Sequence, residues 1–244
     1  EILTKVYERI LIGRVVTVLD EHNMLNKAQY GGLARQGTAA PLRVMANVLE
    51  HARTHGNELH LFVADLSKAF DSIEFWTQGL SWRCLGMPPD IIDLMVDLDA
   101  GSQHPIRENI SKEGATTKVN LGQGRQTEPL LHGRGVRQGS VGGPIKWIVA
   151  MNMWLNYVEF KMKGKGYPIS KDEEFLEQMF IDDSIWATTS PEDMQNMIRC
   201  HERFCSFNKM HLNKDKCTYV VTNAEATPAT KANEALQKTR GKGN

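Results

Sequence analysis

Two adjacent aspartates, Asp182 and Asp183, separate two short apolar segments, and this arrangement constrains the fold more than any other feature of the sequence. The flanking segments, LEQMFI and SIWATT, have the apolar and β-branched composition of strands. Two strands joined by two residues form an antiparallel hairpin, so we expect both aspartates in its turn. Taken alone, the pair is better explained as ordinary turn chemistry.

A third aspartate, Asp65, gives the pair a second meaning. It lies near the end of a mostly apolar segment, Leu59 to Leu66, which is typical of a strand buried within a sheet. If this strand neighbours the hairpin, three carboxylates share one apolar-walled spot, where they repel one another without cations. Such oxygen-rich sites suit Mg²⁺. Two such ions can activate an attacking hydroxyl and stabilise a leaving pyrophosphate.

Charge is segregated along the chain, although 29 basic residues balance 29 acidic ones. Residues 61–101 carry seven acidic and two basic side chains, and residues 172–193 carry eight acidic and no basic ones. Residues 102–171 and 194–244 have net charges of +7 and +5. Solvated helix faces also cluster like charges. The sharper interpretation is a metal-binding carboxylate site flanked by surfaces that hold a polyanion.

The remaining pattern predicts a chain of mixed helices and strands. Apolar spacing and helix-start signals predict helices over 2–20, 40–54, 74–85, 89–99, 144–160 and 191–207. Thr38 is a candidate cap for the second of these. TTKVNL, TEPLLHGRGV and KCTYVVT are further strand candidates, and the tail from Glu225 has no apolar periodicity.

Several classes of protein find no support in the composition. No apolar run approaches the roughly 20 residues of a membrane span, so we expect no membrane partner. The N-terminal residues lack the pattern of a secretory leader. The four cysteines form no CxxC pair and fit no zinc-binding spacing together with His201 and His211. We therefore expect free thiols in a reducing, intracellular compartment.

Four sequence blocks, together with the segment upstream of them, point to a known family. In chain order the blocks are Asp65-Leu-Ser-Lys-Ala-Phe-Asp-Ser72, Arg137-Gln-Gly-Ser-Val-Gly-Gly-Pro144, Phe180-Ile-Asp-Asp183 and Asn213-Lys-Asp-Lys216. Their order and spacing resemble motifs A, B, C and D of a reverse transcriptase palm, most similar to those of non-LTR retrotransposon and group II intron enzymes. Upstream, the segment from Gln29 to Thr38 resembles the family's QxGFRxGxST segment. The resemblance covers about residues 1–222.

The resemblance implies an α+β fold, a polymerase fingers-palm with a small antiparallel palm sheet backed by helices. It divides the chain into partial fingers over 1–58, a palm over 59–222 that includes finger or insert segments around 101–135, and a loose tail over 223–244. No thumb follows Val221, and the family's RPI-type fingers segment does not precede motif A. We therefore expect a fragment or a degenerate copy in which the thumb is absent.

The resemblance also implies roles for the acidic residues and one lysine. Asp65 and Asp182 would carry two Mg²⁺ ions, for which Mn²⁺ can substitute, and Asp183 would complete the cluster. Lys216 matches the motif D lysine, which donates a proton to pyrophosphate or neutralises it. Without the motif, a lone lysine before a strand reads as a solvated side chain.

Substrate contacts are implied for the residues that follow Asp65. The main chain of Leu66, Ser67, Lys68 and Ala69 would lie along the incoming triphosphate. Phe70 matches the steric gate, an aromatic ring that leaves no room for a 2′-hydroxyl. From spacing alone Phe70 is better explained as a core aromatic.

Motif B and the upstream segment would supply the remaining contacts. Gln138 and Gly139 fall where the family packs a loop against the templating base and the dNTP. Arg137 is a candidate phosphate contact, or equally an exposed surface arginine. Arg35 and Thr38 would lie in the fingers near the template strand.

The predicted function is RNA-directed DNA synthesis, in which dNTPs are added to the 3′-hydroxyl of a DNA primer on an RNA template, in the service of a retroelement. One alternative is an RNA-dependent RNA polymerase, against which Phe70 and the Arg137-Gln138-Gly139 run argue. The other is a palm that binds RNA without catalysis, against which the three intact carboxylates argue.

Overall fold

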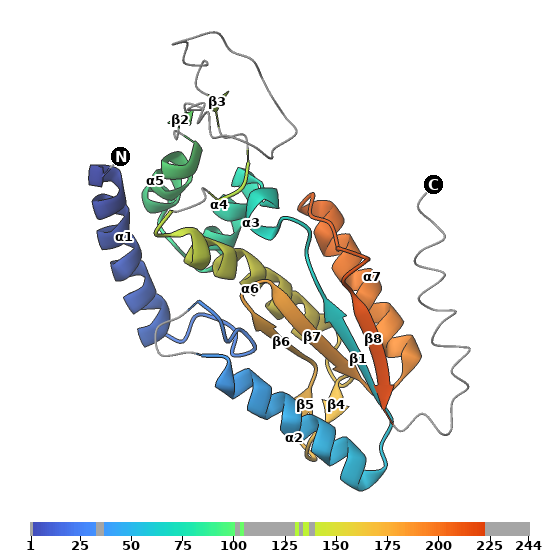
Figure 1. Cartoon of the computed structure of the whole chain (residues 1–244). Helices are drawn as coiled ribbons and strands as arrows, with labels where there is room; N and C mark the ends of the chain where they lie inside the picture. Colours follow the sequence, from blue (N-terminus) through green and yellow to red (C-terminus); the bar gives the residue numbers. More distant parts are fainter. Residues whose placement is uncertain are drawn as a thin grey trace, which may run out of the picture.

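An antiparallel sheet lies at the centre of the computed structural model, which describes residues 2–32, 37–100, 103–104, 130–131, 134–136 and 140–222 (Figure 1). Within these residues the central sheet has four strands in the order β6-β7-β1-β8, each antiparallel to its neighbour. Their bounds are Leu59–Ala64 for β1, Glu177–Phe180 for β6, Asp183–Thr188 for β7 and Thr218–Thr222 for β8. The predicted α+β class with a small antiparallel sheet is confirmed.

The six predicted helices are all present, and their ends agree with the prediction to within one residue. A further helix, α3, is only four residues long, too short to show an apolar period. The bounds are Ile2–Glu21 for α1, Ala39–His55 for α2, Ala69–Ser72 for α3, Phe75–Cys84 for α4, Pro89–Ala100 for α5, Gly143–Lys161 for α6 and Pro191–Phe207 for α7. None of the described helices is long and apolar enough to cross a membrane.

Short strand pairs flank the sheet. β4 (Tyr167–Pro168) pairs with β5 (Glu174–Phe175), and β2 (Gln103–His104) pairs with β3 (Leu130–Leu131). β3 falls inside the predicted TEPLLHGRGV strand, whereas TTKVNL and the tail from Glu225 lie outside the described residues. Thr38 precedes α2, but its side chain makes no capping hydrogen bond, so the predicted side-chain cap is wrong.

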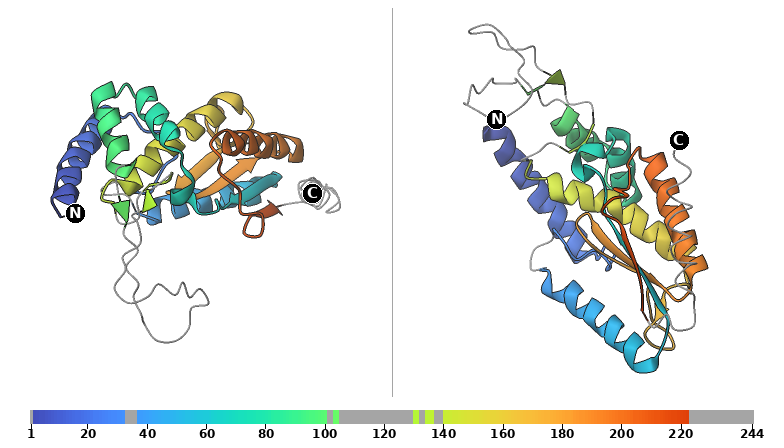
Figure 2. Two further views of the ribbon diagram at one scale, coloured as in Figure 1. Left: turned by 90° about the horizontal axis from the view of Figure 1, so that it is seen from above. Right: turned by 45° about the vertical axis from the view of Figure 1, so that its right-hand side comes forward.

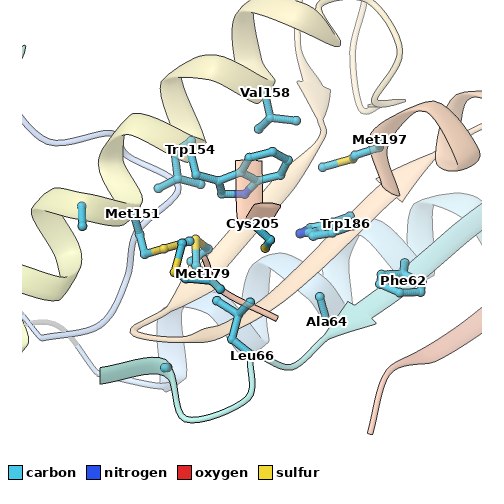
Figure 3. Packing of buried hydrophobic residues seen from close by; sticks show 14 of the residues in the cluster. Phe62, Ala64, Leu66, Met151, Trp154, Val158, Met179, Trp186, Met197 and Cys205 are labelled. Carbon is cyan, nitrogen blue, oxygen red and sulfur yellow. The ribbon is translucent and has the colours of Figure 1, made fainter. Parts of the chain in front are cut away.

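Helices α6 and α7 cover one face of the sheet (Figures 1 and 2). Alternate strand residues point into this layer, and the core is built around the indoles of Trp147, Trp154 and Trp186, all fully buried. Figure 3 shows Trp154 and Trp186 beside the methionines that fill the gaps between them. The tryptophans of α6 therefore pack against the sheet as part of the core.

The opposite face is covered over only part of its length. Helix α2 packs Val48 and Ala52 against Leu59 and Leu61 at the start of β1. Further along β1, Val63 is 37% exposed. On β8, Val220 is 44% exposed. Among the described elements, none covers the sheet near the end of β1, which is where Asp65 follows.

A separate core attaches the N-terminal helix to the rest of the chain. Ile12 and Leu19 of α1 pack with Trp82 of α4, Met95 of α5 and Val149 of α6. Helix α6 therefore has one side in this core and the other against the sheet. It fixes the position of α1 relative to the strands.

Candidate active site

Three aspartates meet at one end of the sheet. The register of β1 and β7 pairs Ala64 with Ser184, which places Asp65 opposite Asp183 one step further. Because side chains alternate along a strand, Asp65 and Asp183 share the face of Val63, away from α6 and α7. The prediction that the strand of Asp65 neighbours the hairpin is confirmed.

The hairpin turn differs from the prediction by one residue. Phe180 pairs with Asp183, so the turn consists of Ile181 and Asp182, and Asp183 is the first residue of β7. The expectation that both aspartates lie in the turn is wrong, since the ladder extends to Asp183. Asp182 is half-buried and Asp183 is exposed, so the two carboxylates have different environments.

The carboxylates interact electrostatically. Burial raises the pKa of Asp182 above its usual value, the charges of Asp183 and Asp65 raise it further, and Lys216 opposes them. Lys216 Nζ lies 3.8 Å from Asp65 Oδ2. That same oxygen is buried and accepts no hydrogen bond within the described residues. The site thus gathers negative charge, which among the described residues Lys216 partly offsets.

The donor chemistry fits a hard divalent cation. Mutually repelling carboxylates with a buried oxygen that lacks a hydrogen bond are suitable ligands for Mg²⁺ or Mn²⁺. Within the described part of the chain, no three His, Cys, Asp or Glu side chains already form a group that could hold a metal ion. Asp65, Asp182 and Asp183 are therefore candidate ligands whose coordinating arrangement is not preassembled.

Motif A and motif D are joined along the chain that follows β1. Leu66 bridges to Leu212, Ser67 N–H donates to the His211 carbonyl at 2.8 Å, and Asn213 N–H donates to the Asp65 carbonyl at 2.8 Å. These bonds extend the β1–β8 pairing past Asp65 and hold the loop that leads to Lys216. The structure therefore brings the predicted lysine to the carboxylates, while its proton-donor role stays a prediction.

The predicted triphosphate segment forms a sharp bend. The side chains of Leu66 and Ala69 are buried, so the main chain is what these residues can offer a ligand. Lys68 has a φ of 49°, in the left-handed region, and α3 starts directly after it. Phe70 is half-buried with its ring 5.4 Å from that of Trp147, centroid to centroid. Its steric-gate role stays a prediction.

Several predicted contacts lie outside the described residues, namely Arg35, Arg137, Gln138 and Gly139. Thr38 is exposed at the start of α2, and its contact with a template stays a prediction. On the near side of motif B, Val136 N–H donates to the Phe70 carbonyl at 2.8 Å. The chain just before Arg137, Gln138 and Gly139 of motif B is thus hydrogen-bonded to motif A.

Sequence reasoning missed Glu8, which anchors the other side of motif B. Its carboxylate accepts the Ser140 hydroxyl and the N–H groups of Val141, at 3.2 Å, and Gly142, at 3.3 Å. A signal was present, because Glu8 precedes the buried Ile12 by four residues and so lies on the apolar face of α1.

Sequence reasoning also gave no role to Gln29. Its side chain binds both peptide groups of Ile181 in the hairpin turn, and Trp147 of α6 binds the same residue. Two signals were present, namely the match of Gln29 to the first residue of the QxGFRxGxST segment and the glycine at position 31. A Cβ there would lie 2.6 Å from the Ile181 nitrogen, and glycine often marks such a close approach of two backbones.

Solved structures with a similar fold include two telomerases. The apo telomerase of Candida tropicalis superposes with a TM-score of 0.64 at 11% identity, over 91% of this chain and 37% of that one. The telomerase of Candida albicans, in complex with a fragment of telomeric RNA, gives 0.52 at 13% identity, over 93% of this chain and 36% of that one. At these identities the likeness concerns the fold.

Sequence comparison gives the family. The Retrovirus-related Pol polyprotein from type-2 retrotransposable element R2DM of Drosophila melanogaster is 26% identical over 190 residues, which span 78% of this chain and 16% of that protein. Residues 1–236 match the family model described as reverse transcriptase (RNA-dependent DNA polymerase). Motifs A, C and D lie together at one end of the sheet, and the chain belongs to the reverse transcriptase family.

Proposed function

We propose that the chain is the catalytic part of an RNA-directed DNA polymerase, which adds dNTPs to the 3′-hydroxyl of a DNA primer on an RNA template. The observation that carries the proposal is the electrostatic interaction of three carboxylates at one end of the sheet. Asp65 and Asp183 lie on neighbouring strands, Asp182 lies in the adjoining turn, and Lys216 lies beside Asp65. In this proposal residues 1–58 are partial fingers and residues 59–222 are the palm.

Two divalent cations, Mg²⁺ or Mn²⁺, would be held by Asp65 and Asp182 with a smaller share from Asp183; when bound, they lower the pKa of the primer hydroxyl and stabilise the leaving pyrophosphate. The exposed Lys216 ammonium can swing from Asp65 to the pyrophosphate and donate a proton there. The main chain from Leu66 to Ala69 would orient the triphosphate, because the bend at Lys68 follows Asp65 closely along the chain.

The uncovered sheet face is where the primer terminus would lie. Val63 and Val220 present an apolar floor there, against which a sugar can pack. Phe70 would exclude a 2′-hydroxyl from the incoming nucleotide. Gln138 and Gly139 would contact the templating base and the dNTP. Arg137, Arg35 and Thr38 would contact the backbone of the nucleic acid.

Primer extension tests the proposal. The chain is incubated with a DNA primer on an RNA template, Mg²⁺ or Mn²⁺, and either dNTPs or rNTPs. We expect extension with dNTPs and a loss of at least about 100-fold in Asp182→Ala, because a charge that acts in the transition state is removed. Extension unchanged by Asp182→Ala would refute the assignment of the carboxylates. Preferred use of rNTPs would identify an RNA polymerase, and RNA binding without extension would identify a non-catalytic palm.

A further inference from the structure

We propose that Gln29 is a positioning residue of the active site, which holds Ile181 in a strained turn and so sets the place of Asp182. The inference rests on the proposed function in that it gives this turn a catalytic purpose. Gln29 and Asp182 are far apart in the sequence. The link between them is the peptide backbone of Ile181.

The turn adopts a conformation that its residue disfavours. Ile181 has a φ of 63°, in the left-handed region that glycine, asparagine and aspartate usually occupy. For a β-branched residue this φ is an outlier, and such strain persists only where surrounding contacts over-determine it. The residue that carries the strain directly precedes Asp182, so the orientation of that carboxylate depends on the turn.

The hydrogen bonds that hold the turn come from the side chains of Gln29 and Trp147. Gln29 Oε1 accepts the Ile181 N–H at 3.0 Å, and Gln29 Nε2 donates to the Ile181 carbonyl at 3.3 Å. Trp147 Nε1 donates to the same carbonyl at 2.9 Å. Both polar groups of the strained residue are therefore bound by side chains, which fixes the peptide planes on either side of it.

The holding groups are themselves fixed. Gln29 is 2% exposed, and its neighbours join the edge of β6, where Met179 N–H donates to the Ala28 carbonyl at 2.7 Å and Tyr30 N–H donates to the Met179 carbonyl at 2.8 Å. Gln29 Oε1 also accepts the Gly31 N–H at 3.0 Å, which fixes its amide. The fingers segment thus lies against the turn as a rigid support.

The arrangement suits a site whose charges repel. Asp65, Asp182 and Asp183 push one another apart, so a free turn would relax away from the place that a cation requires. A glycine at position 181 would adopt the same φ without strain, so its conformation would not depend on Gln29. The clamp therefore fixes the backbone that carries Asp182 before any ligand arrives, so that mainly side chains have to move to coordinate a cation, which lowers the cost of binding.

Manganese binding to the full chain, measured by electron paramagnetic resonance, tests the proposal apart from polymerisation. In Gln29→Ala we expect the dissociation constant for Mn²⁺ to rise on the order of tenfold, since hydrogen bonds to a buried amide are lost. In the Ile181→Gly variant, whose glycine needs no support for its φ, Gln29→Ala should raise the dissociation constant by less than about threefold. A double-mutant cycle measures this coupling between Gln29 and Ile181. Trp147→Phe, which removes only the indole donor, should weaken Mn²⁺ binding in the same direction and serves if Gln29→Ala does not fold.

The matched control is Gln178→Ala, because Gln178 of β6 is nearly as buried as Gln29, while its side-chain oxygen accepts no hydrogen bond within the described residues. It should lower the melting temperature and leave Mn²⁺ affinity unchanged. Equal effects of Gln29→Ala and Gln178→Ala, additive costs in the cycle, or no saturable Mn²⁺ binding by the unaltered chain would each overturn the proposal. The expected pattern in a chain that extends no primer would refute the proposed function and leave the positioning role intact.

Discussion

Glu177 shows how the core of the palm imposes a protonation state on a single side chain. It lies on β6, only 7% exposed, and accepts a hydrogen bond from Trp154 Nε1 at 2.7 Å. Burial raises the pKa of its carboxyl to about 8, although the Trp154 hydrogen bond works in the other direction. The side chain is therefore protonated at neutral pH, so Glu177 adds no negative charge to the core between the sheet and α6.

This protonation predicts a pH dependence of stability. The unfolded carboxyl releases its proton near pH 4.5, while the folded one keeps it to about pH 8. Because the folded state binds more protons in this window, its stability falls as pH rises, by up to about 1.4 kcal/mol per pH unit. Glu177→Gln should lack this slope. Urea unfolding of the wild type and of Glu177→Gln between pH 6.5 and 8 measures the slope as a difference. His201, whose pKa burial lowers from 6.5 to about 3, takes up a proton only on unfolding, and it contributes equally to both proteins.

The matched control for this substitution is Glu173→Gln, which changes an exposed glutamate a few residues earlier. The free energy of unfolding of that variant should follow the wild type at every pH. A Glu177→Gln variant whose curve also runs parallel to the wild type would contradict the protonated state of Glu177.

At the scale of elements, a buried ion pair connects α1, α5 and α6. Lys146 is fully buried, and its Nζ lies 3.0 Å from Asp99 Oδ2 and 3.4 Å from Glu8 Oε1. Burial would raise the pKa of Glu8, but the Ser140 hydroxyl and Lys146 lower it overall. Since Glu8 also binds the loop that starts α6, it couples the N-terminal helix to motif B.

Glu8→Ala should therefore destabilise the chain by about 3 kcal/mol, because it leaves a buried lysine with one carboxylate fewer. The control Glu21→Ala, at the exposed end of the same helix, should change stability by less than about 0.5 kcal/mol. Urea unfolding of both variants measures the difference. A loss in Glu8→Ala no larger than in Glu21→Ala would show that the Ser140 loop and Lys146 do not depend on Glu8.

Local patterns predicted the elements well, and long-range contacts explain what they missed. Helices such as α7 could be placed because Pro191 and the apolar period mark them within a few residues of sequence. The turn was misplaced by one residue because its position depends on the pairing of Phe180 with Asp183. Gln29 and Glu8 went unassigned because each acts on residues more than 130 positions away.

The candidate site was predictable to the same extent. Asp65, Asp182 and Lys216 could be named from motif order. Asp65 directly follows β1, Asp182 directly precedes β7, and Lys216 lies two residues before β8. That Asp183 would be exposed while Asp182 is half-buried follows only from the register of the hairpin. A capping role for Thr38 failed because the residue type alone does not determine the φ and ψ that a side-chain cap needs.

At the scale of the whole molecule, the two cores on opposite faces of the sheet share its strands, and the core around α1 shares α6 with one of them. Because each core depends on elements of another, we expect the chain to unfold cooperatively. Cys205 of α7 reports on this, since it is 4% exposed and burial raises its pKa to about 12. Cys84 is exposed. In pulsed labelling with iodoacetamide, followed by peptide mass spectrometry, Cys205 should react on the order of 10³-fold or more slowly than Cys84, because it waits for global opening.

The Cys84→Ser variant is the control, since it removes the fast site and should leave the slow rate of Cys205 unchanged. Urea at concentrations below the unfolding midpoint should accelerate Cys205 and not Cys84. If Cys205 reacts as fast as Cys84 in the native chain, α7 opens independently of the sheet.

The attachment of residues 28–30 to the edge of β6 has a consequence for when the molecule becomes competent during synthesis. The hairpin of β6 and β7 is local and can form as soon as its own residues leave the ribosome. The hydrogen bonds from Gln29 to Ile181 cannot form so early, since they close a loop of about 150 residues. Residues 28–30 are synthesised early, but they can bind the hairpin only after β6 and β7 have been synthesised. We therefore infer that the turn of Ile181 and Asp182 reaches its final conformation late in folding.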